Sequence, residues 1–420
     1  MKKALSVLLL FMLLGTLVFA QDVVLVLWDI RTESDNSTPA VLDAIARFEA
    51  DHPGVKIKHE PISNDHYKTR IRTAMSANNE PDIFMSWGSS SLELYVREGK
   101  VLDLTPYMTD EWLDRFVPAS LAIGMFDGKY YGLPVTSMNT AVIYYRTDIF
   151  EKYGLEVPKT YSELLNVVDV LKANNIIPFT LANKTRWTGS MYYVYLVDRI
   201  GGPEAFRNAL NRTGAFNDEP FIRAGEIIQE LVRKGAFPQG VNGMDEDTGQ
   251  SRALLYADRA AMYLMGTWAN GTFPSENPEI SAKIDFFPFP AIEGGKGDPK
   301  NLIGTPGDNY YSVSAKCAHP ELAVKFLQYL TDAQMAKKLV AAGNIPPFTG
   351  AEDDIKDARI RKTNELLNQA PHVQLWYDQA LPLELAEVHL NTTQALFGLQ
   401  ITPEEAANQM EATAVEVLGK

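Results

Sequence analysis

The sequence predicts an α/β protein of two lobes, each a mainly parallel β-sheet flanked by helices, with a hinge that the chain crosses three times. Three observations lead to this prediction. The chain has 420 residues, more than one hydrophobic core normally holds. Apolar strand-like runs alternate with amphipathic helical runs in two separate parts of the chain. Breaks rich in proline and glycine, near 133–137, 288–292 and 344–350, separate these parts.

The first twenty residues are predicted to be a cleaved secretory signal. Residues 1–20 carry two lysines, an apolar run over Leu5–Phe19 and small residues at the third-last and last positions, Val18 and Ala20. The run is too short for a stable membrane span, and no cysteine follows it for a lipid anchor. We therefore expect a periplasmic protein that begins at Gln21.

The first part of the mature chain alternates strand and helix. Val23–Trp28 is a continuous apolar run, which is typical of a strand covered on both faces. The next segments predict a helix, a strand, a helix and a strand, over Pro39–Asp51, Val55–His59, Tyr67–Ala77 and Asp82–Trp87. This order predicts a parallel sheet, in which ligands bind outside the carboxyl ends of the strands.

A second run of the same kind follows. Thr140–Tyr145 predicts a strand, a capping box at Thr160–Glu163 begins a helix that continues through Lys172, and Ile177–Leu181 predicts another strand. The remaining expected elements are extended structure over Leu302–Ser314, helices over Pro320–Leu330 and Asp332–Ala341, and a last helix that begins at a capping box over Thr402–Glu405. From the three breaks we expect one lobe to hold 21–134 and 289–345, and the other 135–288 and 346–420.

Composition excludes several classes of partner. The formal net charge is −14, and removal of Lys2 and Lys3 makes it about −16. Such a chain repels phosphate backbones, so no nucleic-acid partner is expected, and no basic stripe points to a membrane surface. Cys317 is the only cysteine, so no internal disulfide can form. Hydrophobic residues make up 46% of the chain, enough to bury large cores.

The motifs of common enzyme classes are missing. The sequence has no G-x-S-x-G, no H-E-x-x-H and no phosphate-binding loop that ends in Gly-Lys-Ser/Thr. Its six histidines form no short metal-ligand pair, and Asp245–Gly249 lacks the glutamate that closes a calcium loop. We therefore expect no enzyme activity, metal or cofactor, although a glycosidase-like carboxylate pair has no sequence signature by which it could be recognised.

Tryptophans follow several of the predicted strands. Trp87 ends the third strand, Trp187 and Trp268 lie after later apolar runs, and Trp376 precedes Tyr377 and Asp378. Any one of them could be a core residue. Together they favour carbohydrate binding, because an indole face covers the apolar C–H face of a pyranose at little entropic cost.

Polar loop residues could contact the hydroxyl groups of such a ligand. Arg31, Glu33, Asn139, Asp308 and Asp378 have suitable side chains. A carboxylate can accept hydrogen bonds from two neighbouring hydroxyls, and these charge-assisted bonds are strong. Each residue taken alone is also typical of a solvated loop or a cap.

These segments resemble a known family. The most specific stretches are Ile143–Leu155 and Pro158–Leu164. Supporting stretches are Pro81–Phe84, Gly99–Leu104, Gly128–Pro134, Ala261–Gly266, Tyr311–Lys316 and His319–Leu327. The chain resembles the extracellular sugar-binding proteins of bacterial ABC transporters (solute-binding protein family 1), the group that includes maltose-binding protein. The resemblance covers nearly the whole mature chain.

The resemblance implies a type II periplasmic-binding-protein fold with a ligand cleft between the lobes. It matches Trp87, Trp268 and Trp376 to positions where family members stack aromatic rings on sugars, and Asp308 and Asp378 to paired acids. The full set of expected ligand-binding residues is Arg31, Glu33, Trp87, Ser89, Ser90, Asn139, Trp187, Trp268, Asp308, Trp376 and Asp378. The serines at 89–91 depart from the acidic and basic pair of maltose binders, which argues against maltose itself.

The function implied is capture of a di- or oligosaccharide and its delivery, by a monomer, to the permease of an ABC importer. Two alternatives stay open. Tyrosine pairs such as Tyr130-Tyr131 and Tyr144-Tyr145 occur in ferric-ion binders of similar fold. An exported glycoside hydrolase with a carboxylate pair is the other alternative.

Overall fold

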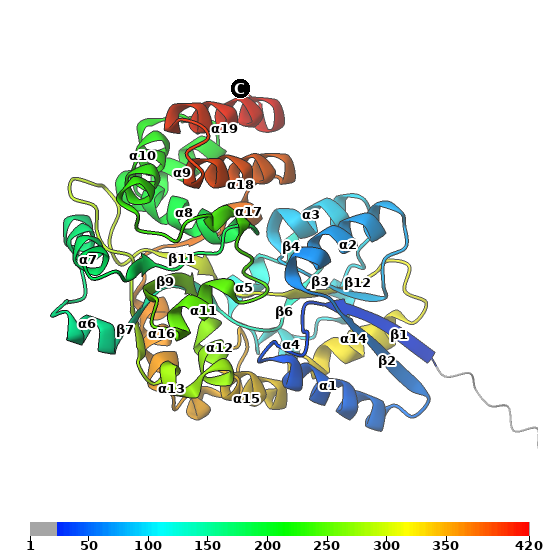
Figure 1. The fold of residues 1–420 in the computed structure, drawn as a ribbon. Helices are drawn as coiled ribbons and strands as arrows, with labels where there is room; N and C mark the ends of the chain where they lie inside the picture. Colours follow the sequence, from blue (N-terminus) through cyan, green and yellow to red (C-terminus); the bar gives the residue numbers. More distant parts are fainter. Residues whose placement is uncertain (1–22, 420) are drawn as a thin grey trace, which may run out of the picture.

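The computed structural model describes residues 23–419. Figure 1 shows two lobes side by side, one formed mostly by the blue and cyan N-terminal elements and the other by green and red elements. The expected signal at 1–20 lies outside the described residues. Within 23–419, no helix is both long and apolar enough to cross a membrane.

The first lobe is built on a five-stranded sheet with the order β2-β1-β3-β12-β6. Its strands are β1 (Val23–Asp29), β2 (Val55–Pro61), β3 (Ile83–Ser86), β6 (Leu133–Pro134) and β12 (Tyr310–Val313). Its helices and its short two-stranded ribbon are α1 (Thr38–Asp51), α2 (Asn64–Ser76), α3 (Ser89–Arg97), η1 (Thr105–Tyr107), α4 (Asp110–Leu113), α5 (Pro118–Ala122), β4 (Met125–Phe126), β5 (Lys129–Tyr130), α14 (Pro320–Tyr329), α15 (Ala333–Ala341) and η3 (Glu352–Asp354). Apolar side chains of these elements form one buried core.

The second lobe is built on a six-stranded sheet with the order β13-β11-β7-β9-β8, in which β10 also pairs with β7. Its strands are β7 (Asn139–Arg146), β8 (Ile177–Phe179), β9 (Ala260–Gly266), β10 (Ile284–Phe287), β11 (Leu302–Thr305) and β13 (Val373–Leu375). Strand β9 is buried at every residue, as expected for a strand covered on both faces.

Helices cover this second sheet. They are α6 (Thr147–Lys152), α7 (Tyr161–Ala173), α8 (Trp187–Gly201), α9 (Pro203–Leu210), α10 (Glu219–Lys234), η2 (Val241–Gly243), α11 (Gln250–Tyr256), α12 (Ala269–Glu276), α13 (Pro278–Ser281), α16 (Ala358–Gln369), α17 (Tyr377–Ala380), α18 (Leu383–Phe397) and α19 (Pro403–Leu418). The expected capping box of α19 is confirmed, since the Thr402 hydroxyl accepts from the Glu405 N–H and Glu405 caps Thr402 in return.

Each sheet contains one strand that runs against all the others. In the first sheet this is β12, which pairs antiparallel with β3 and β6. In the second it is β7, which pairs antiparallel with β9, β10 and β11. Both strands follow a crossing from the opposite lobe, so the chain enters them from the hinge side of the sheet. The sheets are therefore mainly parallel, and the carboxyl ends of the other strands face the opposite lobe.

Three chain segments connect the lobes, and the first two lie next to one another. The first spans 135–138, between β6 and β7. The backbone N–H of Thr136 donates to the carbonyl of Asp308 at 3.3 Å, and that of Met138 donates to the carbonyl of Ile345 at 2.7 Å. The first bond holds this crossing against the second, and the other holds it against the segment that follows α15 of the first lobe.

The second crossing lies later than the sequence analysis expected. A return to the first lobe at residue 289 is wrong, because Phe289 packs in the core of the second lobe and β11 pairs with β7 and β13. The chain leaves the second sheet only after Thr305. Pro288 and Pro290 end strand β10 but do not end the lobe.

The third crossing also lies later than expected. Residues after 345 were assigned to the second lobe, yet Phe348 and Ala351 pack in the core of the first. The Thr349 N–H donates to the Arg115 carbonyl of the first lobe at 2.8 Å. Helix α16 is the first later element on the second lobe, where Thr363 accepts a hydrogen bond from Asn270 at 3.1 Å.

Two glycines bring the lobes into close contact beside the hinge. Gly271 belongs to α12 of the second lobe, and Gly343 follows α15 of the first. A Cβ atom on Gly343 would lie 2.6 Å from the Cα of Gly271. A Cβ atom on Gly271 would overlap the Asn36 amide and the Ala342 carbonyl. Only glycine therefore allows this approach.

Candidate ligand-binding site

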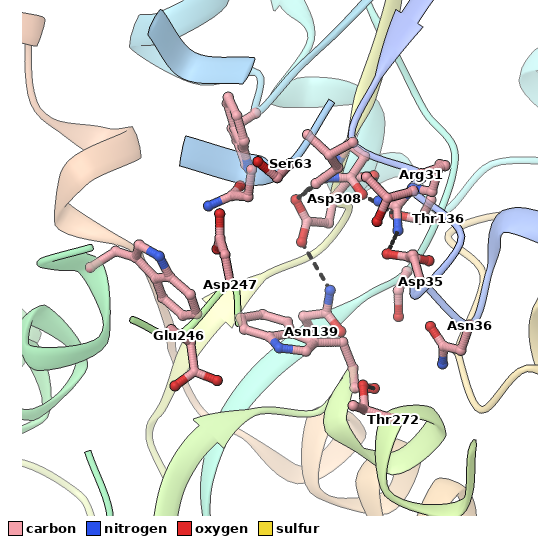
Figure 2. Close-up of a pocket in the computed structure, with 18 of the residues that line it drawn as sticks. Arg31, Asp35, Asn36, Ser63, Thr136, Asn139, Glu246, Asp247, Thr272 and Asp308 are labelled. Carbon is pink, nitrogen blue, oxygen red and sulfur yellow. Dashed lines mark hydrogen bonds and ion pairs between the residues drawn. The ribbon is translucent and has the colours of Figure 1, made fainter. Parts of the chain in front are cut away.

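A cavity of about 400 Å³ lies between the two lobes. Most of its lining comes from segments that follow β1, β2, β3 and β6 of the first lobe, and β8, β9, β11 and β13 of the second. These are the carboxyl ends of strands that run in the common direction of each sheet, where ligands of such sheets bind. Figure 2 shows polar side chains from both lobes that face this space.

The hinge crossings supply one wall of the cavity. Asn139 begins β7, and its side-chain amide donates to Asp308 Oδ2 at 3.0 Å, as Figure 2 shows. Asp308 Oδ1 accepts from the backbone N–H of Asn309 at 2.8 Å. The Thr136 hydroxyl in turn donates to Asn309 Oδ1 at 2.9 Å. Burial raises the pKa of Asp308, although these donors and Arg31 act in the opposite direction.

Arg31 lies in the loop after β1. Its guanidinium Nη1 donates to Asp35 Oδ2 at 2.6 Å and to the Ser37 hydroxyl at 2.8 Å. Its backbone N–H donates to Asp29 Oδ1 at 2.9 Å, so both the loop and the side chain are held in place. The Arg31 Nε atom has no hydrogen-bond partner within the described chain, and the residue lines the cavity.

Three indoles form a continuous series on the second-lobe side. Trp268, after β9, lies between Trp187 at the start of α8 and Trp376 after β13. The ring centroids are 6.0 Å apart for Trp187 and Trp268, and 6.1 Å apart for Trp268 and Trp376. Gly266 permits this arrangement, because a Cβ atom there would overlap the Trp268 ring. Three residues far apart in sequence thus form one aromatic wall.

Trp87 faces these indoles from the first lobe. It follows β3, and its ring lies 6.0 Å from Tyr67 in an edge-on arrangement. The Lys68 ammonium lies 5.1 Å from the Trp87 ring centroid, within the range of a cation–π contact. The same ammonium is 4.0 Å from Asp378 Oδ2 of the second lobe. Burial raises the pKa of Asp378, while Lys68 favours its charged form.

Three of the expected residues do not line the cavity. Glu33 is exposed to solvent, and Ser89 begins α3 outside the lining. Ser90 instead joins the lobes, since its hydroxyl lies 2.6 Å from the carbonyls of both Gln379 and Leu381. The sequence placed the serines near the ligand because they follow Trp87, but the turn into α3 directs Ser90 to the lobe interface.

The other expected residues all line the cavity. They are Arg31, Trp87, Asn139, Trp187, Trp268, Asp308, Trp376 and Asp378.

Several lining residues were missed by the sequence analysis. They include Asn36, Lys68, Glu246, Asp247, Arg252, Asn344 and Gln379. Glu246 is 4% exposed, and it accepts from Arg252 Nη1 and from the Tyr263 hydroxyl, each at 2.6 Å. The only sequence signal for this group was the acidic turn at Asp245–Gly249. Across residues 23–419, no group of three or more His, Cys, Asp or Glu side chains could hold a metal ion.

One serine–histidine pair lies at the cavity wall. The Ser190 hydroxyl is 2.6 Å from His389 Nε2, a spacing that nucleophilic catalysis also uses. However, His389 Nδ1 has no hydrogen-bond partner within the described chain, so no acid orients the ring. Burial lowers the pKa of His389 to about 3. A base that is this weak would not activate Ser190, and the pair is a buried hydrogen bond.

Most of the sequence matches the model of a known family. Residues 33–337 match the bacterial extracellular solute-binding proteins. Together with the two lobes and the cavity between them, this match shows that the chain belongs to that family. The family and the named relatives below are binding proteins.

Two curated relatives cover most of the chain. A multiple sugar-binding protein from Streptococcus mutans is 24% identical over 350 residues, which are 80% of this chain and 78% of that protein. An uncharacterized ABC transporter extracellular-binding protein from Pyrococcus horikoshii is 27% identical over 323 residues, which are 75% of this chain and 70% of that protein.

Solved structures share the fold. One structure, described in connection with xylan utilization by the thermophilic bacterium Caldanaerobius polysaccharolyticus, has a TM-score of 0.87 at 32% identity. The alignment covers 93% of this chain and 100% of the other chain. A chitin oligosaccharide binding protein also has a TM-score of 0.87, at 23% identity, and covers 95% of this chain and 100% of that one. At 23% identity the second likeness concerns the fold alone.

Proposed function

We propose that this protein binds a di- or oligosaccharide between its lobes in the periplasm and delivers it, as a monomer, to the permease of an ABC importer. The observation that carries the proposal is the indole series of Trp187, Trp268 and Trp376, which faces Trp87 and the carboxylates Asp308 and Asp378 across one cavity. Aromatic faces suit the C–H faces of sugar rings, and carboxylates suit their hydroxyls.

The size and lining of the cavity support a small ligand of this class. A volume of about 400 Å³ lies within the usual range for small-molecule sites, which combine apolar walls with a few placed polar groups. The relationship to the xylan-associated structure, and to a relative named as a multiple sugar-binding protein, supports the same ligand class.

The position between the lobes supports a closure mechanism. Asp308 and Asn139 lie at the hinge, Trp87 on the first lobe and Trp268 on the second. A ligand gains contacts with both lobes only when they are closed, so it shifts the population toward the closed form. The permease would then receive the closed protein, and no bond of the sugar changes.

Isothermal titration calorimetry with neutral trisaccharides tests the proposal. Xylotriose, cellotriose, chitotriose, maltotriose and raffinose should include at least one ligand, and binding should shift the tryptophan fluorescence because four indoles line the cavity. Absence of binding by every di- and oligosaccharide tested would contradict the proposal.

Product analysis separates binding from hydrolysis. Chromatography after prolonged incubation should recover the bound sugar intact, because the cavity has no Ser–His–acid arrangement and its buried Glu246 is already bonded to Arg252 and Tyr263. Shorter oligosaccharides in the mixture would favour the glycoside hydrolase alternative.

A further inference from the structure

Acidic side chains outnumber basic ones around the cavity. Among the described residues that line it, six carry carboxylates and three carry cationic groups. The acids are Asp35, Glu246, Asp247, Glu276, Asp308 and Asp378, and the cations are Arg31, Lys68 and Arg252. The formal balance is thus an excess of three negative charges, in a space partly shielded from water.

Both guanidinium groups are already bound to acids of the protein. Arg31 Nη1 lies 2.6 Å from Asp35 Oδ2. Arg252 lies 2.6 Å from Glu246 Oε1 and 2.9 Å from Glu276 Oε2. An anionic ligand would have to compete with these carboxylates for the charge of both arginines, although the Arg31 Nε has no partner within the described residues. The charges of the two arginines therefore mainly balance the protein's own acids.

The remaining acids have little compensating charge. The hydrogen-bond partners of Asp308 in the described chain are neutral amides of Asn139 and Asn309. Lys68 approaches Asp378 only to 4.0 Å. Asp247 accepts a backbone N–H across the lobes at 3.1 Å. An added carboxylate would meet like charges from the hinge and from the second lobe.

Several neutral polar atoms in the lining have no hydrogen-bond partner among residues 23–419. Asn344, 5% exposed, has an unbonded Nδ2, and Gln379, 9% exposed, has an unbonded Oε1. Trp187 Nε1 is buried and unbonded as well. Buried polar atoms without partners are costly, and these donors and acceptors match hydroxyl groups, each of which can donate and accept.

We infer that the cavity binds a neutral segment of a saccharide and rejects one in which a uronate carboxylate enters the cavity. The inference rests on the proposed function and narrows its ligand class. It does not concern acidic branches that stay in solvent.

Matched acid and ester ligands test the inference. Each neutral trisaccharide that binds is converted to its uronate by oxidation of a hydroxymethyl group or, for xylotriose, by replacement of one xylosyl unit of the main chain with a glucuronyl unit. The uronate is then methyl-esterified, which restores neutrality at nearly the same shape. We expect the ester to bind roughly tenfold or more tightly than the acid, because like charges oppose each other across a desolvated interface. The gap should narrow at high salt.

A variant assigns the effect to a particular charge. Asp308→Asn should reduce the ester-to-acid affinity ratio, and the matched control Asp353→Asn, at an exposed site on η3, should leave it unchanged. An acid that binds within about threefold of its ester would overturn the inference. An equal decrease of the ester-to-acid affinity ratio in Asp308→Asn and Asp353→Asn would also overturn it. Failure of every neutral parent to bind would instead remove the proposed function, and this inference with it.

Discussion

Trp268 occupies the middle of the indole series and contacts both neighbouring rings. Its position follows from a single residue, Gly266, and not from a regular element. Trp28 provides a contrast within the same chain, because its ring is covered by the Arg70 guanidinium at 3.9 Å and does not line the cavity. Trp268 is thus the expected ligand contact, whereas Trp28 makes a packing contact.

Replacement of Trp268 by alanine should weaken binding of the best trisaccharide by roughly tenfold or more, about 1.4 kcal/mol. The variant loses the central face of the aromatic wall. Titration calorimetry measures the affinity, and circular dichroism confirms the fold. Trp28→Phe is the control and should bind as the wild type does. Equal affinities for all three proteins would place the ligand elsewhere.

Asp378→Ala should also weaken binding about tenfold, since its carboxylate is expected to accept from sugar hydroxyls. Asp353→Ala serves as the control on an exposed site. Unchanged affinity in Asp378→Ala would indicate that this acid only balances Lys68.

His389 predicts a pH dependence of stability. Its side chain is fully buried, and desolvation lowers its pKa to about 3, whereas an unfolded histidine has a pKa of about 6.5. Below pH about 6.5 the unfolded state binds a proton that the folded state does not. The stabilising effect of neutral His389 is therefore full above that pH and is lost as the pH falls toward 3.

Urea unfolding at several pH values measures this effect. Wild type should lose up to about 1.4 kcal/mol of unfolding free energy per pH unit more than His389→Gln does in that range. Glutamine keeps a hydrogen-bonding group for Ser190 but does not titrate. Carboxylates are common to both proteins and cancel in the comparison, so parallel pH profiles would contradict the assignment.

At the scale of elements, the end of β9 positions the binding wall. Gly266 closes this buried strand, and the Trp268 ring folds back over it. A methyl group at 266 would overlap the ring and force it to turn away. The position of the Trp268 ring in the aromatic wall therefore depends on the absence of a Cβ atom at residue 266.

Gly266→Ala should lower sugar affinity by roughly tenfold, similar to loss of the indole itself. Gly243→Ala is the matched control, because no atom lies within 4 Å of a Cβ placed there. Calorimetry of both variants, with thermal unfolding as a check, tests the expectation. An affinity in Gly266→Ala equal to that of Gly243→Ala would show that the ring tolerates the methyl group.

The sequence predicted individual elements better than their partners. Val23–Trp28 and the capping box of the last helix were recognised from local patterns, and the structure confirms both. Strand β11 was expected in the first lobe, but it pairs with β7 of the second. The sequence of a strand does not by itself indicate which strand it pairs with. Such pairing depends on contacts between distant segments, which hydrophobic periodicity does not record.

For the site as well, the sequence revealed local patterns but not the contacts between distant segments. Tryptophans after strands were found because strand ends converge at one edge of a parallel sheet. Glu246 was missed because it lies within a polar turn, and Asn344 because it lies in a proline-rich break that was interpreted only as a boundary. Ser90 was misplaced because the direction of a helix start is a three-dimensional property.

At the scale of the whole molecule, ionic contacts join the lobes away from the hinge. Glu387 of α18 binds Arg72 of α2 at 3.3 Å and Arg186 of its own lobe at 2.8 Å. Burial opposes the charged form of Glu387, yet the two arginines lower its pKa. The pair of Arg72 and Glu387 exists only while the lobes are close.

Glu387→Gln should shift the ligand-free protein toward a more open form. Small-angle X-ray scattering should then give a larger radius of gyration than for wild type, and sugar affinity should fall a few-fold because closure costs more. The control is Glu384→Gln, at an exposed position on the same helix. A radius equal to that of wild type would show that this ion pair does not influence closure.

The contact between Gly271 and Gly343 has a consequence for engineering. Because two backbones touch there without side chains, a bulkier residue at 271 would act as a wedge beside the pivot, where a small obstruction produces a large displacement at the mouth of the cavity. One substitution beside the pivot would thus yield a receptor held partly open, with its aromatic wall intact, as a reference state for sensors based on this scaffold.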